Sequence, residues 1–488
     1  MNNTNCKAWF KKPLDIVYCA PYVFMAAWLL SGCASSNLHE TSEQQERSVE
    51  SLSGESKQEK LLNIVMILSD DHAWNDYSFM GHDIVQTPAL DQLASQGVTF
   101  TRGYIPTSLC RPSLATIITG LYAHQHGITG NDPSRNLPGG KTGEQYQAQR
   151  AEIIAKIDSV DTLPSMLKAK GYRSLQTGKW WEGNYSRGGF DQGMTSGFPQ
   201  KGGRHGDDGL KIGREGLDEI TTFIDETIIN DQPFFVWYAP YLPHSPHNPP
   251  ERLLKKYDNR GLPLPIAKYY AMVEWFDETN GQLIDFLESR KLRDNTLIVY
   301  IADNGWITNP EQTNRFLPRS KQSPDDSGVR TPIMFSLPNQ LAPQMRPELV
   351  SSIDIVPTIL GAVGLDVPSE LPGLNLFENM QQALPIEREA IYGEGFAHDM
   401  DDLNDPESTL MYRWVIEGDW KLILSYDGKN ISYQKYHEDV LGAPRLFNLR
   451  NDEYETKNLA EKRPDLVDRL SAKLNEWYPL KTRRVLTD

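Results

Sequence analysis

The chain has 488 residues, with 49 Lys or Arg against 65 Asp or Glu, which gives a formal net charge of -16. This acidic balance excludes a protein that clamps nucleic acid through its whole surface. With 39% hydrophobic and 23% charged residues, the chain is neither disordered nor fibrous. We predict a well-buried globular protein with more than one lobe.

The N-terminal segment has the pattern of a bacterial lipoprotein signal. Three lysines precede an apolar stretch over residues 23–30, and Leu-Ser-Gly-Cys ends at Cys33. The alternatives are an ordinary cleaved signal or a membrane anchor, but the apolar stretch is short for a membrane span. We expect a signal peptide over residues 1–32, lipidation of Cys33 and a flexible tether over residues 33–60. The protein is then expected in the bacterial cell envelope, lipid-anchored on the periplasmic side or at the outer membrane.

The cysteine count draws attention to a single thiol. Of four cysteines, Cys6 and Cys19 fall in the predicted signal peptide and Cys33 is the predicted lipid site. Cys110 alone stays free, with no partner for an internal disulfide. In an exported protein this suggests a side chain that is chemically used or modified. The alternative is a small buried hydrophobic residue.

Strands alternate with helical segments along most of the chain. Continuous apolar runs at residues 62–68, 234–238 and 296–302 predict buried parallel strands. Apolar residues at helical spacing predict a long amphipathic helix over about residues 268–290. We therefore predict an α/β fold with a mainly parallel central sheet sandwiched by helices, over a catalytic domain of residues 61–375.

Two of the predicted strands end in acidic and amide side chains. Asp70 and Asp71 follow the first strand, and Asp303 and Asn304 follow the run at residues 296–302. Ligands of open α/β sheets gather at the carboxyl ends of strands. An oxygen-only cluster favours Ca²⁺ or Mg²⁺ over Zn²⁺, and a cation would keep crowded carboxylates ionised. Taken singly, Asp-Asp also suits a turn or helix N-cap, and Asp-Asn-Gly suits a hairpin turn.

The segment around Cys110 predicts a loop that becomes a short helix. Pro112 suits the first helical turn, and Gly120 suits the end. Cys110 is therefore expected at a helix N-terminus, where the helix dipole and free amides favour an anionic group.

The C-terminal region predicts a smaller α+β lobe over residues 376–488. Short strand-like runs lie at residues 414–416 and 421–424, and a final helix with one apolar face begins at Pro464. We expect this lobe to complete the rim of the pocket and to cover the edge of the sheet.

Several separated motifs, from about Asn63 to the C-terminus, resemble the type I sulfatases, the formylglycine-dependent branch of the alkaline phosphatase superfamily. The resemblance implies an alkaline-phosphatase-like version of the predicted fold. The motifs that carry it, in chain order, are Asp70-Asp71, Cys110-Arg111-Pro112-Ser113, Thr119-Gly120, Gly178-Lys179-Trp180, Pro243-His244-Ser245-Pro246-His247, Asp303-Asn304-Gly305, Lys321, Gly328-Val329-Arg330-Thr331-Pro332, Asp354-Ile355-Val356-Pro357-Thr358, Asp419-Trp420-Lys421-Leu422 and Leu446-Phe447-Asn448-Leu449.

The resemblance implies a chemistry and a set of site residues. In the family, a maturation enzyme oxidises the motif cysteine, here Cys110, to formylglycine; one hydroxyl of its hydrate attacks sulfur and the other later expels sulfate. Lys179, Lys321 and His244 correspond to groups that bind sulfate, and His244 is suited to protonate the departing alcohol. Ca²⁺, rather than Mg²⁺, is the cation that we expect to polarise a sulfate oxygen. Its predicted ligands are Asp70, Asp71, Cys110, Asp303 and Asn304.

Two positions depart from the family pattern. The family normally has Arg four positions after the modified cysteine, where this chain has Leu114. We take Arg111, directly after Cys110, as the candidate that supplies the missing guanidinium. Many members also have a sulfate-contacting His two positions after the lysine, where this chain has Trp181. An indole cannot accept a proton, so Trp181 predicts a different environment for the leaving group.

The residues expected to bind the substrate lie near these motifs. His247, Trp181, Arg204 and His205 are the candidates, with an aromatic floor formed by Trp74, Trp180, Trp181, Tyr185 and Trp306 and a basic rim formed by Arg187, Lys201, Arg204, His205, Arg315 and Arg319. Such a pocket suits a sulfated oligosaccharide or polysaccharide. A phosphate or phosphonate ester hydrolase of the same superfamily and a non-catalytic glycan-binding lipoprotein are the alternative interpretations.

Overall fold

The computed structural model describes residues 60–427 and 442–487. The predicted signal peptide, the lipidation site Cys33 and the tether up to residue 59 lie outside these residues. No helix in the described part of the chain is both long and apolar enough to cross a bilayer.

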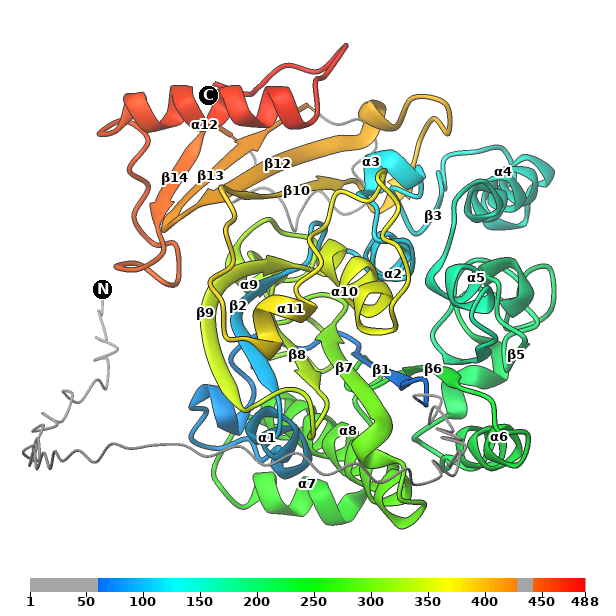
Figure 1. The fold of residues 1–488 in the computed structure, drawn as a ribbon. Coiled ribbons are helices and arrows are strands. Elements are labelled where there is room, and N and C mark those ends of the chain that lie inside the picture. The colour runs from blue at the N-terminus through cyan, green and yellow to red at the C-terminus, as the bar shows by residue number, and fades with distance from the viewer. Residues whose placement is uncertain (1–59, 428–441, 488) are drawn as a thin grey trace, which may run out of the picture. The chain divides into compact units, whose positions relative to one another are not determined.

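The central sheet has eight strands in the order β5-β4-β6-β1-β7-β8-β2-β9 (Figure 1). All its strands run parallel except β8, which is antiparallel to both of its neighbours. The predicted mainly parallel sheet and its three predicted strands, now β1, β6 and β7, are confirmed. The strands are β1 (Asn63–Ser69), β2 (Val98–Tyr104), β4 (Arg173–Gly178), β5 (Gln192–Gly193), β6 (Phe234–Ala239), β7 (Thr296–Ala302), β8 (Arg330–Ser336) and β9 (Gln344–Ser351).

Helices cover both faces of this sheet, as predicted. Alternate residues of β1 point to opposite faces: Ile64 and Met66 pack with α2, α5 and α10, whereas Val65 and Ile67 pack with α1, α6 and α8. The predicted long helix is α8, which begins a few residues early because Pro265 suits its first turn. The helices of this part of the chain are α1 (Pro88–Ser95), α2 (Cys110–Thr119), α3 (Ala123–His126), α4 (Glu144–Ala155), α5 (Leu163–Lys168), α6 (Asp218–Ile229), α7 (Glu251–Asp258), α8 (Leu264–Ser289), α9 (Asp326–Val329), α10 (Ile355–Ala362) and α11 (Phe377–Gln381).

The predicted C-terminal α+β lobe is a four-stranded antiparallel sheet with one helix packed on it (Figure 1). Its elements are β10 (Ile391–Phe396), β12 (Leu410–Glu417), β13 (Trp420–Ser425), β14 (Arg445–Asn448) and α12 (Pro464–Trp477). Its first strand begins at Ile391, and the hydrophobic core that holds Leu376 and Met380 also holds Ile391 and Trp414. The boundary at residue 376 stays a prediction. The short strands β3 (Asp132–Pro133) and β11 (Asp399–Met400) pair in parallel.

Buried ion pairs join the lobe to the catalytic domain. The Lys421 ammonium of β13 lies 2.7 Å from an Asp326 carboxylate oxygen and 2.8 Å from one of Glu455. Arg445 of β14 lies 3.0 Å from Asp325. Since Asp325 and Asp326 mark the start of α9, shortly after Lys321, the lobe fixes the end of the loop that carries this lysine.

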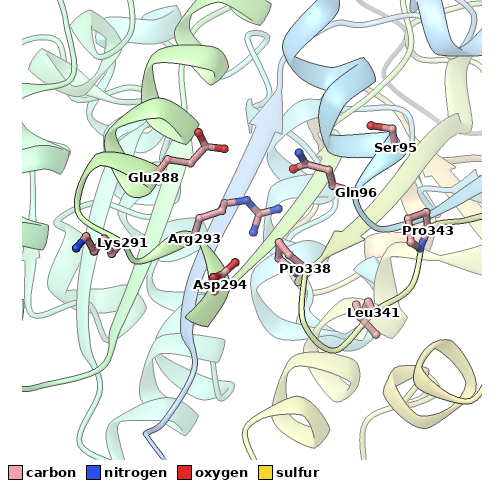
Figure 2. A pocket seen from close by; sticks show the side chains of 9 residues that line it. All are labelled: Ser95, Gln96, Glu288, Lys291, Arg293, Asp294, Pro338, Leu341 and Pro343. Atoms are coloured by element: carbon pink, nitrogen blue, oxygen red, sulfur yellow. The ribbon is translucent and has the colours of Figure 1, made fainter.

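A cavity of about 650 Å³ lies at the edge of the sheet where β7 begins and β8 ends (Figure 2). Arg293 projects at this edge and donates to the Thr296 carbonyl oxygen at 3.0 Å and to the Ser336 hydroxyl. Exposed Glu288, Lys291 and Asp294 surround it. The edge is opposite to the one that carries the predicted metal ligands, so this cavity is not the predicted site.

Candidate active site

The carboxyl ends of β1 and β7 bring the predicted metal ligands together. The strands pair in parallel up to Ser69 and Ala302, so Asp70 and Asp303 leave the sheet side by side. The backbone N–H of Asp71 donates to Asp303 Oδ1 at 3.1 Å, and Asn304 Nδ2 donates to Asp71 Oδ1 at 2.6 Å. Asp71 has a φ of 63°, a left-handed conformation that turns the chain sharply after the strand.

Cys110 is the first residue of α2 and faces the same centre. Its Sγ lies 3.3 Å from Asn304 Oδ1 and 3.2 Å from Lys321 Nζ, and the residue is only 2% exposed. Burial raises the pKa of the Cys110 thiol to about 12, although Lys179 and Lys321 oppose this rise. The unmodified side chain therefore stays protonated and is a poor nucleophile at neutral pH.

Two buried lysines bridge the carboxylates. Lys179 Nζ lies 2.6 Å from Asp70 Oδ1 and 3.3 Å from Asp303 Oδ2, and Lys321 Nζ lies 2.5 Å from Asp71 Oδ1. Lys179 follows β4 through Gly178, where a Cβ would come within 1.8 Å of the Ala239 carbonyl oxygen. Burial would lower the pKa of Lys179, but the neighbouring carboxylates raise it well above its ordinary value.

The carboxylate cluster fits a divalent cation. Asp70 Oδ2 and Asp71 Oδ2 are buried and have no hydrogen-bond partner. Burial and the nearby Asp70 raise the pKa of Asp303 to about 7, so the lysines alone do not satisfy the cluster. One potential ligand atom from each of Asp70, Asp71, Cys110 and His244 lies within 4.8 Å of the others. Crowded oxygen ligands of this kind suit a hard cation.

His244 contacts the carboxylates of this centre, whereas His247 packs among aromatic side chains. His244 Nε2 is 3.5 Å from Asp71 Oδ2 and its Nδ1 is 2.5 Å from the Ser245 carbonyl oxygen. Burial lowers the pKa of His244 to about 3, so its imidazole is neutral. The buried ring of His247 packs against Tyr269 and Trp306, with neither ring nitrogen hydrogen-bonded. A contact of His247 with substrate stays a prediction.

The predicted substrate-binding residues Trp181, Arg204 and His205 form one stack. The Arg204 guanidinium lies 4.6 Å from the centre of a Trp181 ring, and the His205 ring meets Trp181 edge-on at 5.2 Å. Arg204 also pairs with Asp132 at 2.5 Å. His205 connects the stack to the centre through Tyr241, whose ring lies 4.2 Å from that of His244.

Arg111 has another partner than the prediction assigned to it. Its guanidinium forms a buried bidentate pair with Glu182, at 2.8 and 2.5 Å, and donates to the Asn131 carbonyl oxygen. It therefore ties the start of α2 to the loop after Lys179 instead of pointing its donors at the Cys110 thiol. Leu114, where the family has Arg, is buried in the core.

The predicted aromatic floor and basic rim are not continuous surfaces. Trp180 packs edge-on against Phe190 and Trp237 in the core, because an apolar ring directly after a buried strand is covered by the helices. In the rim, Arg187 pairs with Asp158 and Arg319 pairs with Asp325. Those cations are neutralised and are not aimed at an anionic chain.

Sequence reasoning missed the residues that support the predicted ones. Tyr241 contacts His244 and lies 5.6 Å below the Lys179 ammonium, and Glu182 holds Arg111. Tyr241 could have been found, because it follows β6 at the carboxyl edge, as the metal ligands follow β1 and β7. Glu182 carries no such signal, since its role depends on the folded position of Arg111.

The chain is similar to known proteins in sequence and in fold. The sequence model of the family described as Sulfatase matches residues 62–365. The chain is 28% identical to human N-acetylgalactosamine-6-sulfatase over 438 residues, covering 80% of each chain. It is 22% identical to N-acetylglucosamine-6-O-sulfatase of Bacteroides thetaiotaomicron, covering 87% of this chain and 85% of the relative. A solved structure in complex with its substrate D-glucosamine-2-N,6-O-disulfate superposes with a TM-score of 0.64 at 20% identity, covering 86% of this chain and 97% of that one.

Proposed function

The chain belongs to the sulfatase family, and from this premise we propose that it removes sulfate from a sulfated oligosaccharide or polysaccharide. One observation carries the proposal. Cys110 Sγ is buried within 3.3 Å of Lys321 and Asn304, at a centre where two carboxylate oxygens have no hydrogen-bond partner. This arrangement suits a modified side chain and a cation that act together on one small anion.

The proposed cofactors are a formylglycine made from Cys110 and a Ca²⁺ ion. Asp70, Asp71, Asp303 and Asn304 would hold the cation, which supplies charge for polarising a sulfate oxygen. The formylglycine supplies a hydrated aldehyde hydroxyl as the nucleophile. A protonated thiol cannot take this role, which supports the need for a sulfatase-maturation enzyme.

The chain's own cations and histidine account for the remaining steps. Lys179 and Lys321 would place their ammonium groups beside the equatorial oxygens of sulfate, where charge increases during attack. His244 is neutral in the free site, but a bound anion would raise the pKa of its imidazole by charge attraction. Once protonated, it is placed to donate to the departing sugar oxygen.

The relatives support the substrate class. The two sulfatases are named for 6-sulfated N-acetylhexosamines, and the structural neighbour binds a sulfated glucosamine. The Trp181, Arg204 and His205 stack connects to His244 through Tyr241, so aromatic rings and a guanidinium paired with Asp132 lie beside the centre. We therefore propose a sulfated hexosamine as the unit in the centre.

Sulfate release tests this function. The mature protein is incubated with Ca²⁺ and matched sets of N-acetylhexosamine 6-sulfates, an aryl sulfate, and the corresponding phosphate esters. We expect sulfate release from the sugar esters to exceed phosphate release by orders of magnitude. Faster phosphate release would favour a phosphate or phosphonate hydrolase. Activity on the aryl ester alone would refute the proposed glycan substrate. A Cys110 peptide with the mass of an unmodified thiol would favour glycan binding alone.

We also propose a lipid anchor at Cys33 in the cell envelope. The Leu-Ser-Gly-Cys pattern supports it. Metabolic labelling with a radioactive fatty acid in a bacterial host tests this placement, with Cys33→Ala as the unlabelled control. Label that persists in the variant would refute it.

A further inference from the structure

A cavity beside the catalytic centre has no role in the steps above. One part, of about 390 Å³, is lined by residues that include Trp74, Asp83, Glu453 and Tyr454. A second part, of about 230 Å³, is lined by residues that include Asp76, Tyr269 and Trp306. The two parts share Asn75, His82, Tyr270 and Tyr454, so they form one hollow, which we call the aromatic cavity.

Two side chains of this cavity also touch the catalytic centre. The Tyr269 hydroxyl donates to the Asp71 carbonyl oxygen at 3.2 Å. The Trp306 ring lies 5.8 Å from Lys321 Nζ. Tyr269 and Trp306 are buried and form a single layer between the aromatic cavity and the groups expected to bind sulfate. The cavity therefore neighbours the centre on the other side of this layer.

The lining of the cavity has the chemistry that a sugar ring needs. Tyr454 is 54% exposed, so it offers a ring face to solvent, and the Trp74 ring lies 6.4 Å from it. Asn75 and Asp76 add polar groups that can bond to hydroxyls. Pockets that combine aromatic faces with a few fixed polar groups are typical of small-ligand sites.

The charges of the lining select against a second sulfate. The lining holds three acidic residues, Asp76, Asp83 and Glu453, and one basic residue, His82. Burial raises the pKa of Asp76 to about 7 and lowers that of His82, so the remaining acidic groups are Asp83 and Glu453. Arg330 pairs with Glu453 at 3.3 Å and its guanidinium lies 3.8 Å from the centre of the Trp74 ring, whereas Asp83 is exposed to solvent. A sulfated or uronic acid unit would meet like charge here, whereas a neutral ring would not.

We propose that the aromatic cavity binds an uncharged sugar unit of the same glycan, adjacent to the sulfated unit in the catalytic centre. This proposal rests on the proposed sulfatase function and adds a second requirement to it: the enzyme distinguishes glycans by the unit beside the sulfate ester. Long substrates with a neutral neighbour are turned over more efficiently than the sulfated monosaccharide.

The test compares Tyr454→Ala with the native protein on three substrates: a sulfated monosaccharide, an oligosaccharide with a neutral neighbouring unit, and one with a sulfated neighbour. We expect the variant to lose about 10-fold in kcat/KM on the neutral-neighbour oligosaccharide, mainly through KM, because ring stacking contributes on this scale. The monosaccharide should be unaffected. Tyr454→Phe keeps the ring and should keep the preference. Met345→Ala, at an equally exposed residue of β9, is the matched control.

A charge variant tests the selection separately. Asp83→Lys should raise kcat/KM on the oligosaccharide with a sulfated neighbour several-fold, relative to kcat/KM on the oligosaccharide with a neutral neighbour. Equal effects of Tyr454→Ala on all three substrates, or no effect on either oligosaccharide, would overturn the proposal while leaving the sulfatase function intact. If the native protein releases no sulfate from any of the three, the sulfatase function itself fails.

Discussion

The two edges of the central sheet hold buried charges in different ways. At the carboxyl edge, three carboxylates, two ammonium groups and a thiol crowd together, and two carboxylate oxygens have no hydrogen-bond partner. At the amino edge, a cavity of about 650 Å³ surrounds one buried guanidinium, that of Arg293, whose Nη atoms donate to backbone and hydroxyl oxygens. Its Nε lacks a partner, but the acidic groups nearby are exposed to water.

This comparison teaches that volume alone does not locate a site. At the amino-edge cavity the acidic groups are solvated, and the buried Arg293 guanidinium keeps its Nη atoms hydrogen-bonded. The carboxyl edge leaves buried carboxylates unsatisfied, and burial of that kind is costly unless a ligand compensates it. The following substitutions test whether chemistry is confined to the carboxyl edge.

Removing the Cys110 side chain should have the largest effect. Cys110→Ala removes the precursor of the nucleophile, so we expect kcat for sulfate release to fall by about 10⁴-fold or more. The melting temperature should change little, since Ala occupies less of the same buried space. Sulfate release and thermal melting are measured on the same preparation. Activity within 10-fold of the native protein would contradict the assignment of Cys110.

Neutralising one carboxylate at each edge of the sheet should show directly which edge binds the cation. Asp303→Asn removes a ligand from the cluster, so we expect loss of bound Ca²⁺ and a fall in kcat of about 10² to 10³-fold. The matched control is Asp294→Asn, which makes the same change at the amino edge, where the side chain is exposed. Calcium content by mass spectrometry and sulfate release are the measurements. Equal calcium in both variants would refute the cation site.

Substituting Arg111 tests how much a residue outside the centre contributes to stability and to formylglycine formation. Arg111→Ala leaves Glu182 buried without its partner, so we expect a loss of about 3 kcal/mol in the free energy of unfolding and lower formylglycine content. The double variant Arg111→Met with Glu182→Leu removes both charges and should recover most of the stability. If formylglycine also recovers in the double variant, Arg111 only braces α2. If it stays absent, the guanidinium serves maturation.

The sequence predicted the residues at the carboxyl edge better than the residues that contact and position them. Strands β1 and β7 could be found because their apolar runs are continuous, and their ends placed Asp70, Asp71, Asp303 and Asn304 together by the rule for parallel sheets. Lys179 and Lys321 lie in loops, so only the family motifs identified them. The predicted aromatic floor included Trp74 and Trp306 of the aromatic cavity, but Tyr454 was missed because it belongs to a distant loop and reaches Trp74 only through tertiary packing. The same holds for the partner of Arg111.

At the amino edge, Arg293→Ala should affect stability and not activity. The substitution removes donors to the Thr296 carbonyl and the Ser336 hydroxyl and leaves these oxygens buried, so we expect a loss of about 1 to 3 kcal/mol in the free energy of unfolding. Sulfate release per folded molecule should stay within twofold. Denaturant unfolding and initial rates are the measurements. A tenfold loss of activity at full folding would mean that the amino edge does take part in the reaction.

The smallest effect on the active site should come from substituting Asp277. This buried carboxyl group resembles that of Asp303 in pKa, but both of its oxygens are hydrogen-bonded. It accepts the backbone N–H groups of Ala89 and Leu90 at 2.9 and 2.8 Å, and burial outweighs these bonds and raises its pKa to about 7. The folded state therefore holds a proton between about pH 4 and pH 7 that the unfolded state releases, so the free energy of unfolding decreases as pH rises through this window, by at most about 1.4 kcal/mol per pH unit. Asp277→Asn should flatten this slope without changing Ca²⁺ content, as followed by denaturant unfolding at a series of pH values. A slope that survives the substitution would assign the titration to another buried carboxyl group, that of Asp76, Asp303 or Glu455, and only a slope caused by Asp303 should be abolished by Ca²⁺.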